Sequence, residues 1–267
     1  MAASSQTNPE EKPKEAYEIM REQIQAGLKE HKRSDLGLFL SSLSAGLEVG
    51  FSILIIGIIF TLFKNESSVS QLALMMALVY PIGYIFAIIG RSELFTEHTT
   101  LATIPVMNGE ATLRSLAKLW LIVYLGNLAG GYIFGSISLV FNEEMHLIGK
   151  DFFYFVSEKM LKYSVGATLI SSIMAGWLMG MLSWLLSSAQ DTFSRVVMIF
   201  LVTFLISIAG LHHCIVGSIE VFMAFFADAN QISWLQFLRF QVLSTLGNII
   251  GGVFLVAMVK YAHSRMH

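Results

Sequence analysis

The chain has 267 residues, of which 55% are hydrophobic and 13% are charged, and its formal net charge is −2. Together with a positive mean hydropathy of +0.65, this composition excludes an ordinary soluble globular protein. No basic patch indicates a nucleic-acid partner, and a single cysteine, Cys214, excludes an internal disulfide framework. The composition therefore predicts an all-α polytopic protein whose surroundings are the lipid bilayer.

A polar segment, residues 1–34, comes before the apolar part of the chain. From residue 13 to residue 33, apolar side chains recur at helical spacing on a charged background, at Tyr17, Met20, Ile24 and Leu28. This pattern predicts an amphipathic helix, which lies along the membrane surface, caps the cytoplasmic mouth of the protein, or is simply solvated. The polar composition predicts no cleaved signal peptide.

Six apolar segments follow, and two of them are too long to be one transmembrane helix. A hydrocarbon core of about 30 Å needs about 20 helical residues. Single spans are expected over residues 36–63, 119–142, 163–190 and 240–259. The runs 71–108 and 196–227 contain the polar stretches LFTEHTT (94–100) and LHHCIVG (211–217), so each is expected to form two half-helices, the later ones beginning near Glu97 and His212.

The two halves of the chain repeat the same order of motifs. AGLEVG at 45–50 recurs as AGWLMG at 175–180, and GNLAGG at 126–131 recurs as GNIIGG at 247–252, with a polar break between them in each half. Each glycine cluster alone indicates only close helix packing, but their order predicts an internal repeat. Because each half has three spans, the second half must begin on the opposite side of the membrane, which makes an inverted repeat.

The distribution of lysine and arginine predicts the orientation. These residues are more frequent in the segments that would share a side with the amino terminus than in residues 64–70 and 143–162, so both termini are expected in the cytoplasm.

The predicted organisation is a cytoplasmic segment with the amphipathic helix over 1–34, a channel domain over 35–263 with repeat halves at about 35–142 and 160–263, and a cytoplasmic tail over 264–267.

The two breaks also indicate the chemistry of the solute. A helix that restarts at mid-membrane turns its free N–H groups and positive dipole end toward the cavity, which favours an anion or a weak acid over a cation. Thr96 and His213 supply hydrogen-bonding groups there, and a histidine can share a proton with the solute near neutral pH. Apolar neighbours such as Leu94, Phe95 and Ile206 would form constrictions that disfavour a bare charge.

At these motifs the chain resembles the formate/nitrite transporter family, from about residue 27 to residue 261. The resemblance is carried by ELFT at 93–96, LAKLW at 116–120, residues 176–185, the region around His213, and the two GN-xx-GG motifs. It implies a homopentamer in the inner or plasma membrane, with one aquaporin-like pore in each protomer for formate, nitrite, hydrosulfide or short carboxylates. Glu97-His98 and GSIE at 217–220 resemble the YfdC-like branch of the family.

The resemblance also implies roles for individual residues. It places Thr96 and His213 at the pore centre, and Lys159 is the nearest counterpart of a vestibule lysine. The cytoplasmic constriction would consist of Leu94, Phe95 and Tyr84, and the periplasmic one of Tyr80, Met179 and Ile206. The chain departs from the usual family pattern where it has Gly176 and Gly217 instead of asparagine, and His212 instead of glutamate.

Five of the ionisable residues in the apolar segments are further candidates for a functional role, namely Glu48, Glu97, His98, His212 and Glu220. A charged side chain near the bilayer centre costs roughly 2.5 to 3.5 kcal/mol, so each glutamate should have a partner or a water-filled cavity. Glu97 is either a first-turn carboxylate of the following half-helix or a relay group. Glu220 is either a proton-relay or gating group or part of an ion pair. Glu48 is expected to pair with His98 or His212, and these two histidines are either scaffold or relay groups.

Two other classes of function fit parts of the sequence. Histidines, Cys214 and glutamates at membrane depth could ligate a metal or haem in a redox enzyme. Adjacent His212 and His213 would point about 100° apart on a helix, however, and paired axial ligands on neighbouring spans are missing. A pore for neutral solutes is the other alternative. The sequence favours a channel with no cofactor, no metal and no enzymatic activity.

Overall fold

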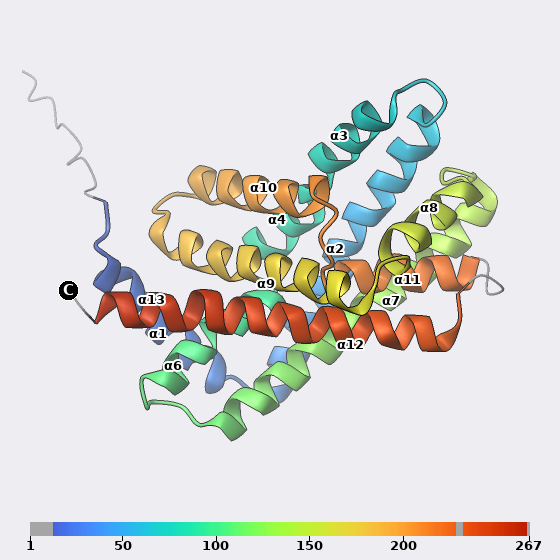
Figure 1. The fold of residues 1–267 in the computed structure, drawn as a ribbon. Helices are drawn as coiled ribbons and strands as arrows, with labels where there is room; N and C mark the ends of the chain where they lie inside the picture. Colours follow the sequence, from blue (N-terminus) through green and yellow to red (C-terminus); the bar gives the residue numbers. More distant parts are fainter. Residues whose placement is uncertain (1–12, 228–231, 266–267) are drawn as a thin grey trace, which may run out of the picture.

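The computed structural model describes residues 13–227 and 232–265, and every regular element in these ranges is a helix (Figure 1). In chain order the elements are α1 (Ala16–His31), α2 (Asp35–Phe63), α3 (Val69–Val79), α4 (Pro81–Ile89), α5 (Phe95–Leu101), α6 (Thr103–Met107), α7 (Leu113–Met145), α8 (Lys150–Leu161), α9 (Val165–Ser188), α10 (Thr192–Ile208), α11 (Val216–Ala227), α12 (Trp234–Ile250), the π-helix η1 (Gly251–Met258) and α13 (Val259–Ser264). The predicted all-α class is confirmed for the described residues.

Five helical segments are long and apolar enough to cross a membrane, judged by length and composition. They are α2, α3 with α4, α7, α9, and α12 with η1 and α13. The helices α10 and α11 are apolar but shorter. The single spans predicted from the sequence all coincide with long helices, and α7 extends beyond the predicted bounds at both ends.

The first long run is broken earlier than predicted. Pro81 starts α4 directly after α3, and the chain then leaves the helix over residues 90–94, where Arg91 has a φ of 64°. The stretch LFTEHTT, predicted as the break, instead forms α5 after its first residue. The reason is a cap from another helix, because the side-chain oxygen of Asn127 accepts the first N–H of α5, from Phe95, at 2.8 Å.

The second long run is broken as predicted at LHHC, but its second half-helix begins later than expected. The helix α10 ends at Ile208, Gly210 turns the chain with a φ of 63°, and α11 begins at Val216 instead of near His212. The ring of His213 accepts the N–H groups of Ile215 and Val216 at its Nδ1 atom. This histidine therefore stays outside the helix and acts as its cap.

The helices α2 and α9 run in opposite directions between two ends of the bundle. The helix α2 starts directly after α1 and ends beside α8, where the Thr61 hydroxyl accepts the Gly149 N–H at 2.8 Å. The helix α9 starts after α8 and ends beside α1, where Gln23 donates to the carbonyl of Ser183 at 2.8 Å. We call these the α1 end and the α8 end, and Figure 1 shows them on opposite sides of the molecule.

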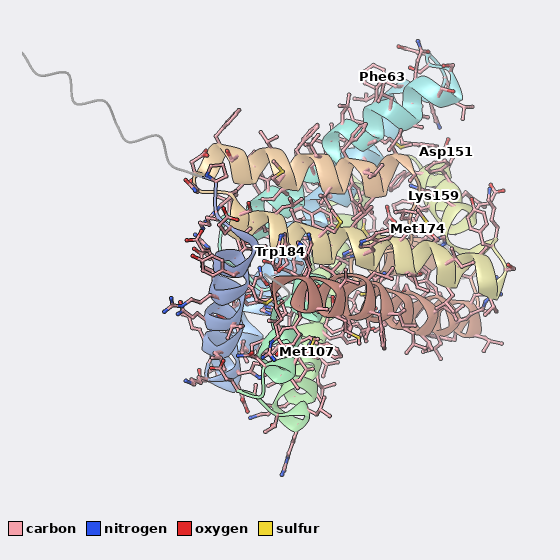
Figure 2. All side chains as sticks on the ribbon, turned by 60° about the vertical axis from the view of Figure 1, so that its left-hand side comes forward. Phe63, Met107, Asp151, Lys159, Met174 and Trp184 are labelled. Atoms are coloured by element: carbon pink, nitrogen blue, oxygen red, sulfur yellow. The ribbon has the colours of Figure 1, made fainter. Side chains whose placement is uncertain are left out.

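The helix expected over residues 13–33 corresponds to α1, which packs against the bundle. Ile19 and Met20 are buried in a cluster with Ile104, Trp184 and Ala257, and Figure 2 shows Trp184 beside this helix. A Cβ atom at Gly27 would collide with the carbonyl oxygen of Leu101 in α5. This close approach excludes a freely solvated helix and fits a cap over the α1 end.

The amphipathic helix α8 is an element that the sequence analysis did not predict. It buries Phe152, Phe153, Val156 and Met160 against the rest of the bundle. These positions follow a helical period, so the pattern was present in a segment for which no helix was predicted. The predicted tail over 264–267 lies only in part within the described residues, and 266–267 are outside them.

Candidate functional site

The two breaks meet at a hydrogen bond between Thr96 and His213. Thr96 is the second residue of α5, His213 precedes α11, and the Thr96 Oγ1 and His213 Nε2 atoms lie 3.0 Å apart. Thr96 is fully buried and His213 is 1% exposed. The pair predicted for the centre of the protein is therefore brought together from positions 117 residues apart in the chain.

The surroundings of His213 determine its tautomer. Its Nδ1 atom accepts the backbone N–H groups of Ile215 and Val216, at 3.2 and 3.3 Å, and so carries no hydrogen itself. The neutral ring then carries its hydrogen on Nε2 and donates it to the Thr96 oxygen. A second proton on Nδ1 would face two N–H donors, so this geometry opposes the charged imidazolium form.

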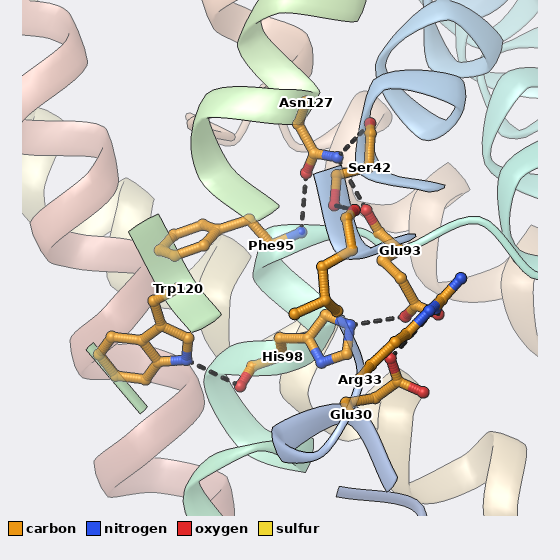
Figure 3. Close-up of polar contacts among 9 residues, drawn as sticks. Glu30, Arg33, Ser42, Glu93, Phe95, His98, Trp120 and Asn127 are labelled. Carbon is orange, nitrogen blue, oxygen red and sulfur yellow. Dashed lines mark hydrogen bonds and ion pairs between the residues drawn. The ribbon is translucent and has the colours of Figure 1, made fainter. Parts of the chain in front are cut away.

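Two asparagines hold the breaks in the same way. Asn127 of α7 accepts the Phe95 N–H and donates to the carbonyls of Ser42 and Glu93, all at 2.8 Å (Figure 3). Asn248 of α12 accepts the Cys214 N–H at 2.9 Å and donates to the carbonyls of Ser172 and His212, at 2.7 and 3.1 Å. Each asparagine thus satisfies backbone groups that the break leaves without a helical partner.

The glycines of the repeated motifs allow these asparagines to approach. A Cβ atom at Gly46 would collide with the carbonyl oxygen of Asn127, and a Cβ at Gly176 would collide with that of Asn248. Gly176 is one of the positions that the resemblance marked as a departure from an expected asparagine. Gly217, the other such position, faces the Phe240 ring, which a Cβ would meet at 2.7 Å. Larger residues would push the helices apart at both places.

The residues predicted for the constrictions are all buried and belong to one hydrophobic core. Tyr84, Leu94 and Met179 are fully buried, and Phe95, Tyr80 and Ile206 are at most 5% exposed. The Phe95 ring packs edge-on against Trp120 and Tyr124. The Tyr80 and Tyr84 hydroxyls lie 3.1 Å apart, and the Tyr84 ring meets the His213 ring edge-on, with centroids 5.7 Å apart. The two tyrosines therefore bring hydroxyl groups into an otherwise apolar region.

A cavity of about 160 Å³ lies toward the α8 end and contains the predicted vestibule lysine. Lys159 of α8 and Glu220 of α11 both line it, among apolar residues such as Ile56, Met76 and Phe152. Glu220 is 4% exposed and interacts electrostatically with Lys159. The structure thus places Glu220 beside a charged partner and an open space, as the sequence required of an intramembrane glutamate.

His98 belongs to a charge cluster at the α1 end instead of the centre. Its Nε2 atom donates to Glu93 at 2.6 Å, and Glu93 also pairs with Arg33 at 2.9 Å (Figure 3). Arg33 bonds to Glu30 of α1 at 3.1 Å, and the His98 carbonyl accepts the Trp120 N–H at 3.1 Å. The cluster ties the break before α5 to the amino-terminal helix. Neither Arg33 nor Glu93 was predicted as part of a site.

The hydrogen bonds found for His212 and Glu48 go to residues other than the central pair. His212 is 1% exposed, and its Nδ1 atom lies 2.8 Å from the Ser171 hydroxyl. Glu97 is the third residue of α5, as expected for a first-turn carboxylate. The prediction that Glu48 pairs with His98 or His212 is wrong, because its carboxylate instead accepts the hydroxyl of Ser44, one turn earlier in α2, at 2.9 Å. No group of three or more metal-ligating side chains occurs among the described residues.

Sequence reasoning treated the GN motifs as packing signals and therefore missed Asn127 and Asn248 as the residues that hold the breaks. A usable signal was present, since an asparagine between glycines in an apolar helix is costly to bury without hydrogen-bond partners. A bundle of apolar helices with two interrupted runs, and a buried polar pair where the interruptions meet, defines a polytopic membrane transport protein.

Comparison with known proteins agrees with this class. The family model described as formate/nitrite transporter matches residues 17–262, and the chain belongs to that family. Its relatives include the inner membrane protein YfdC of Escherichia coli, 33% identical over 95% of this chain and 80% of YfdC. They also include the nitrite transporter NirC of Salmonella typhimurium, 27% identical over 82% of this chain and 80% of NirC. The protein is therefore a multi-pass membrane transporter and not an enzyme.

Solved structures show the same fold. An FNT family ion channel superposes with a TM-score of 0.80 at 21% identity, covering 92% of this chain and 98% of the other. A structure described as a pentameric formate channel with formate bound gives a TM-score of 0.72 at 22% identity, covering 86% of this chain and 97% of the other. The chain thus has the channel fold of this family.

Proposed function

We propose that the protein is a channel for small monovalent anions or their weak acids, of which formate, nitrite, hydrosulfide and short carboxylates are the candidates. The observation that carries this proposal is the buried Thr96–His213 pair at the meeting point of the two breaks. The Nε2–H of His213 donates to the Thr96 oxygen. An oxyanion that reaches the centre can accept this hydrogen bond in place of Thr96. Family membership and the relatives named for formate and nitrite support the same solute class.

The path of the solute would run through the middle of one protomer. In this proposal Thr96 and His213 form the pore centre, Leu94, Phe95 and Tyr84 the cytoplasmic constriction, and Tyr80, Met179 and Ile206 the periplasmic one. Their burial in one core and the contact between the Tyr84 and His213 rings support the assignment. Dry apolar walls on both sides disfavour a bare ion and let a neutral acid pass.

The architecture behind this path is a six-span inverted repeat with the second and fifth spans broken, as in an aquaporin-like protomer. Two observations support it. The helices α2 and α9 run in opposite directions, and the contacts of Ser42, Gly46 and Asn127 in the first half recur at Ser172, Gly176 and Asn248 in the second. The repeat halves are residues 35–142 and 160–263, preceded by a cytoplasmic segment over 1–34.

The orientation and assembly complete the proposal. The protein lies in the inner or plasma membrane, with both termini in the cytoplasm. In this orientation the α1 end faces the cytoplasm, and the α8 end with Lys159 faces the outside. The lysine and arginine distribution and the inner-membrane relative support this arrangement. The protomers form a homopentamer, as stated for the related formate channel structure.

Proton sharing at His213, expected from the sequence, stays a prediction. The imidazole could protonate an arriving anion only after its Nδ1 atom had taken a proton and lost the N–H groups of Ile215 and Val216. The ring can donate a hydrogen bond from Nε2 without this cost. We therefore assign His213 the role of central donor.

Flux measurements in liposomes test the proposed function. Purified protein in proteoliposomes should raise the uptake of at least one of formate, nitrite, hydrosulfide, acetate and lactate above that of protein-free liposomes. Glycerol and water permeation should stay at the protein-free level, because dry constrictions and a donor centre do not favour neutral polyols. Rapid glycerol uptake without anion uptake would favour the neutral-solute pore. Stoichiometric metal or a haem spectrum in purified protein would favour the redox enzyme.

A further inference from the structure

The cavity at the α8 end is lined by a buried carboxyl group and a lysine, Glu220 and Lys159. Glu220 is 4% exposed, lines the cavity, and interacts electrostatically with Lys159. Burying a carboxyl in this way is costly unless water or a ligand completes its hydrogen bonds. A cavity of about 160 Å³ has room for a few water molecules or one small solute.

Few other titratable groups face Glu220. Lys159 of α8 shares its cavity, and Tyr80 and Tyr84, at the junction of α3 and α4 and in α4, interact with it electrostatically. The cavity residues from α2 and α3, and from the chain around the end of α10, are not titratable; they include Ile56, Met76 and Ser207. The arrangement is thus one acid, one base and two hydroxyls at the point where the apolar region begins.

This arrangement has the groups that proton exchange with a weak acid requires. An anion entering the cavity is attracted by the Lys159 ammonium group and meets the Glu220 carboxyl in the same space. Two carboxyl groups this close favour a state in which they share one proton. His213 is less suited to exchange a proton with the solute, because both of its ring nitrogens already take part in hydrogen bonds within the protein.

Building on the proposed channel function, we propose that Glu220 transfers a proton to a small carboxylate or similar oxyanion in this cavity. The O–H bond of protonated Glu220 breaks, and an O–H bond forms on the anion, which continues as the neutral acid past Tyr80 into the constriction. The Glu220 carboxylate that remains is stabilised by Lys159. It regains a proton from water at the α8 end, so one proton enters with each solute.

Formate exchange in proteoliposomes, at equal inner and outer pH from about pH 5 to about pH 8, tests this step. In the wild type, protein-mediated flux should rise as the pH falls. Glu220→Gln keeps the shape of the side chain but cannot give up a proton, so flux at the acidic end should fall by about tenfold or more and lose its pH dependence. Glu220→Asp keeps an ionisable group and should retain a pH-dependent flux with a shifted midpoint.

Neighbouring charges provide the controls. Glu158→Gln removes a glutamate from the same helix as Lys159, paired with Lys162 on the surface, and should leave the pH profile unchanged. Lys159→Met should raise the half-saturating formate concentration while the pH dependence remains. His213→Asn should lower the flux at every pH without removing its slope. Assembly and the melting temperature of each variant are checked first.

The outcomes separate this inference from the function on which it rests. Wild-type protein that carries none of the tested weak acids would overturn the channel proposal itself. Wild-type flux with a Glu220→Gln profile like that of the wild type would overturn the proton-transfer step alone. If Glu220→Gln does not assemble, Glu220→Asp decides, because an unshifted profile would contradict the proposal. A flat profile for His213→Asn combined with a normal one for Glu220→Gln would move the proton transfer to the central histidine.

Discussion

Asn127 and Asn248 perform the same task at the two breaks, although they lie in different halves of the chain. Each side-chain oxygen accepts the N–H of a residue at or near the start of a half-helix, and each amide nitrogen donates to two carbonyls, one from the preceding break and one from a neighbouring helix. The two asparagines thus replace hydrogen bonds that a continuous helix would make within itself. They explain how irregular backbone is tolerated inside an apolar bundle.

Removing either asparagine side chain should therefore destabilise the protein. In Asn127→Ala, the Phe95 N–H and the Glu93 carbonyl lose their partner, and unsatisfied buried groups of this kind cost about 1 to 3 kcal/mol each. Asn248→Ala should cost a similar amount. Thermal unfolding in detergent, followed by tryptophan fluorescence, should show a lowered melting temperature for both variants and a loss of flux.

Asn142→Ala is a matched control for these variants. Asn142 also makes two hydrogen bonds to backbone, with the N–H and carbonyl of Ile148, but in the connection between α7 and α8. This variant should lose stability without losing flux in the protein that remains folded. Full stability in Asn127→Ala and Asn248→Ala would mean that the breaks do not depend on these side chains.

The sequence predicted the existence of the breaks because their evidence is local. Apolar runs longer than one span, interrupted by polar residues, can be read directly, and so can the order of the glycine motifs. The residues at which the half-helices begin depend on tertiary contacts, so the observed helix starts differ from the predicted ones. The cap on α5 comes from Asn127, 32 residues away, and the cap on α11 from the ring of His213.

Pairing among the buried ionisable groups was the least predictable part of the candidate site. Glu48 was expected beside a histidine but bonds to Ser44, and His98 bonds to Glu93, which had been noted only as part of a motif. These partners depend on how the helices are rotated, and the sequence pattern of an almost uniformly apolar helix contains little information about rotation. The Thr96–His213 contact was more predictable, because each residue lies in one of the two polar breaks and the family resemblance places both at the centre.

The charge cluster at the α1 end makes a prediction about dynamics. Arg33 pairs with Glu30 and with Glu93, which in turn bonds to His98. Replacing Arg33 with methionine leaves Glu93 without this partner and loosens the link between the amino-terminal helix and the first break. Amide hydrogen exchange in α1 should become faster in Arg33→Met. Arg21→Met, at an exposed position of the same helix, is the control and should exchange like the wild type.

The assembly makes a separate prediction. The proposed homopentamer should appear as a single symmetric species in mild detergent, and native mass spectrometry or mass photometry measures its mass directly. Because each protomer contains its own path, the Thr96, His213 and Glu220 variants should assemble like the wild type. A population of monomers and dimers alone would contradict the proposed pentamer and leave the path within the protomer untouched.

The proposed cytoplasmic constriction can be tested by shortening the side chains that form it. Leu94 is fully buried and Phe95 is 2% exposed, held between Trp120 and Tyr124. Shrinking both to alanine should widen the path and allow water to enter, so chloride conductance in planar bilayers should rise. Leu72→Ala, which shortens a buried leucine of α3 elsewhere in the core, controls for a general loss of packing. A folded Leu94→Ala, Phe95→Ala variant with wild-type ion leakage would place these side chains away from the path.

The central histidine can be tested by separating its two hydrogen-bonding roles. Its Nδ1 atom caps α11, and its Nε2–H points to Thr96. Asparagine is a favoured helix cap, so His213→Asn should keep α11 in place and the melting temperature close to that of the wild type. Its shorter side chain no longer reaches Thr96, so weak-acid flux should fall.

His213→Ala removes the cap as well, so it should lose both stability and flux. His212→Asn, which changes the neighbouring ring bonded to Ser171, should have a much smaller effect on flux. Measuring melting temperature and formate uptake on the same preparations separates the two roles, because a cap affects both quantities and a solute-binding donor affects only uptake. If His213→Asn transports formate at the wild-type rate, the ring serves only to start α11, and the donor at the pore centre must be sought in Thr96.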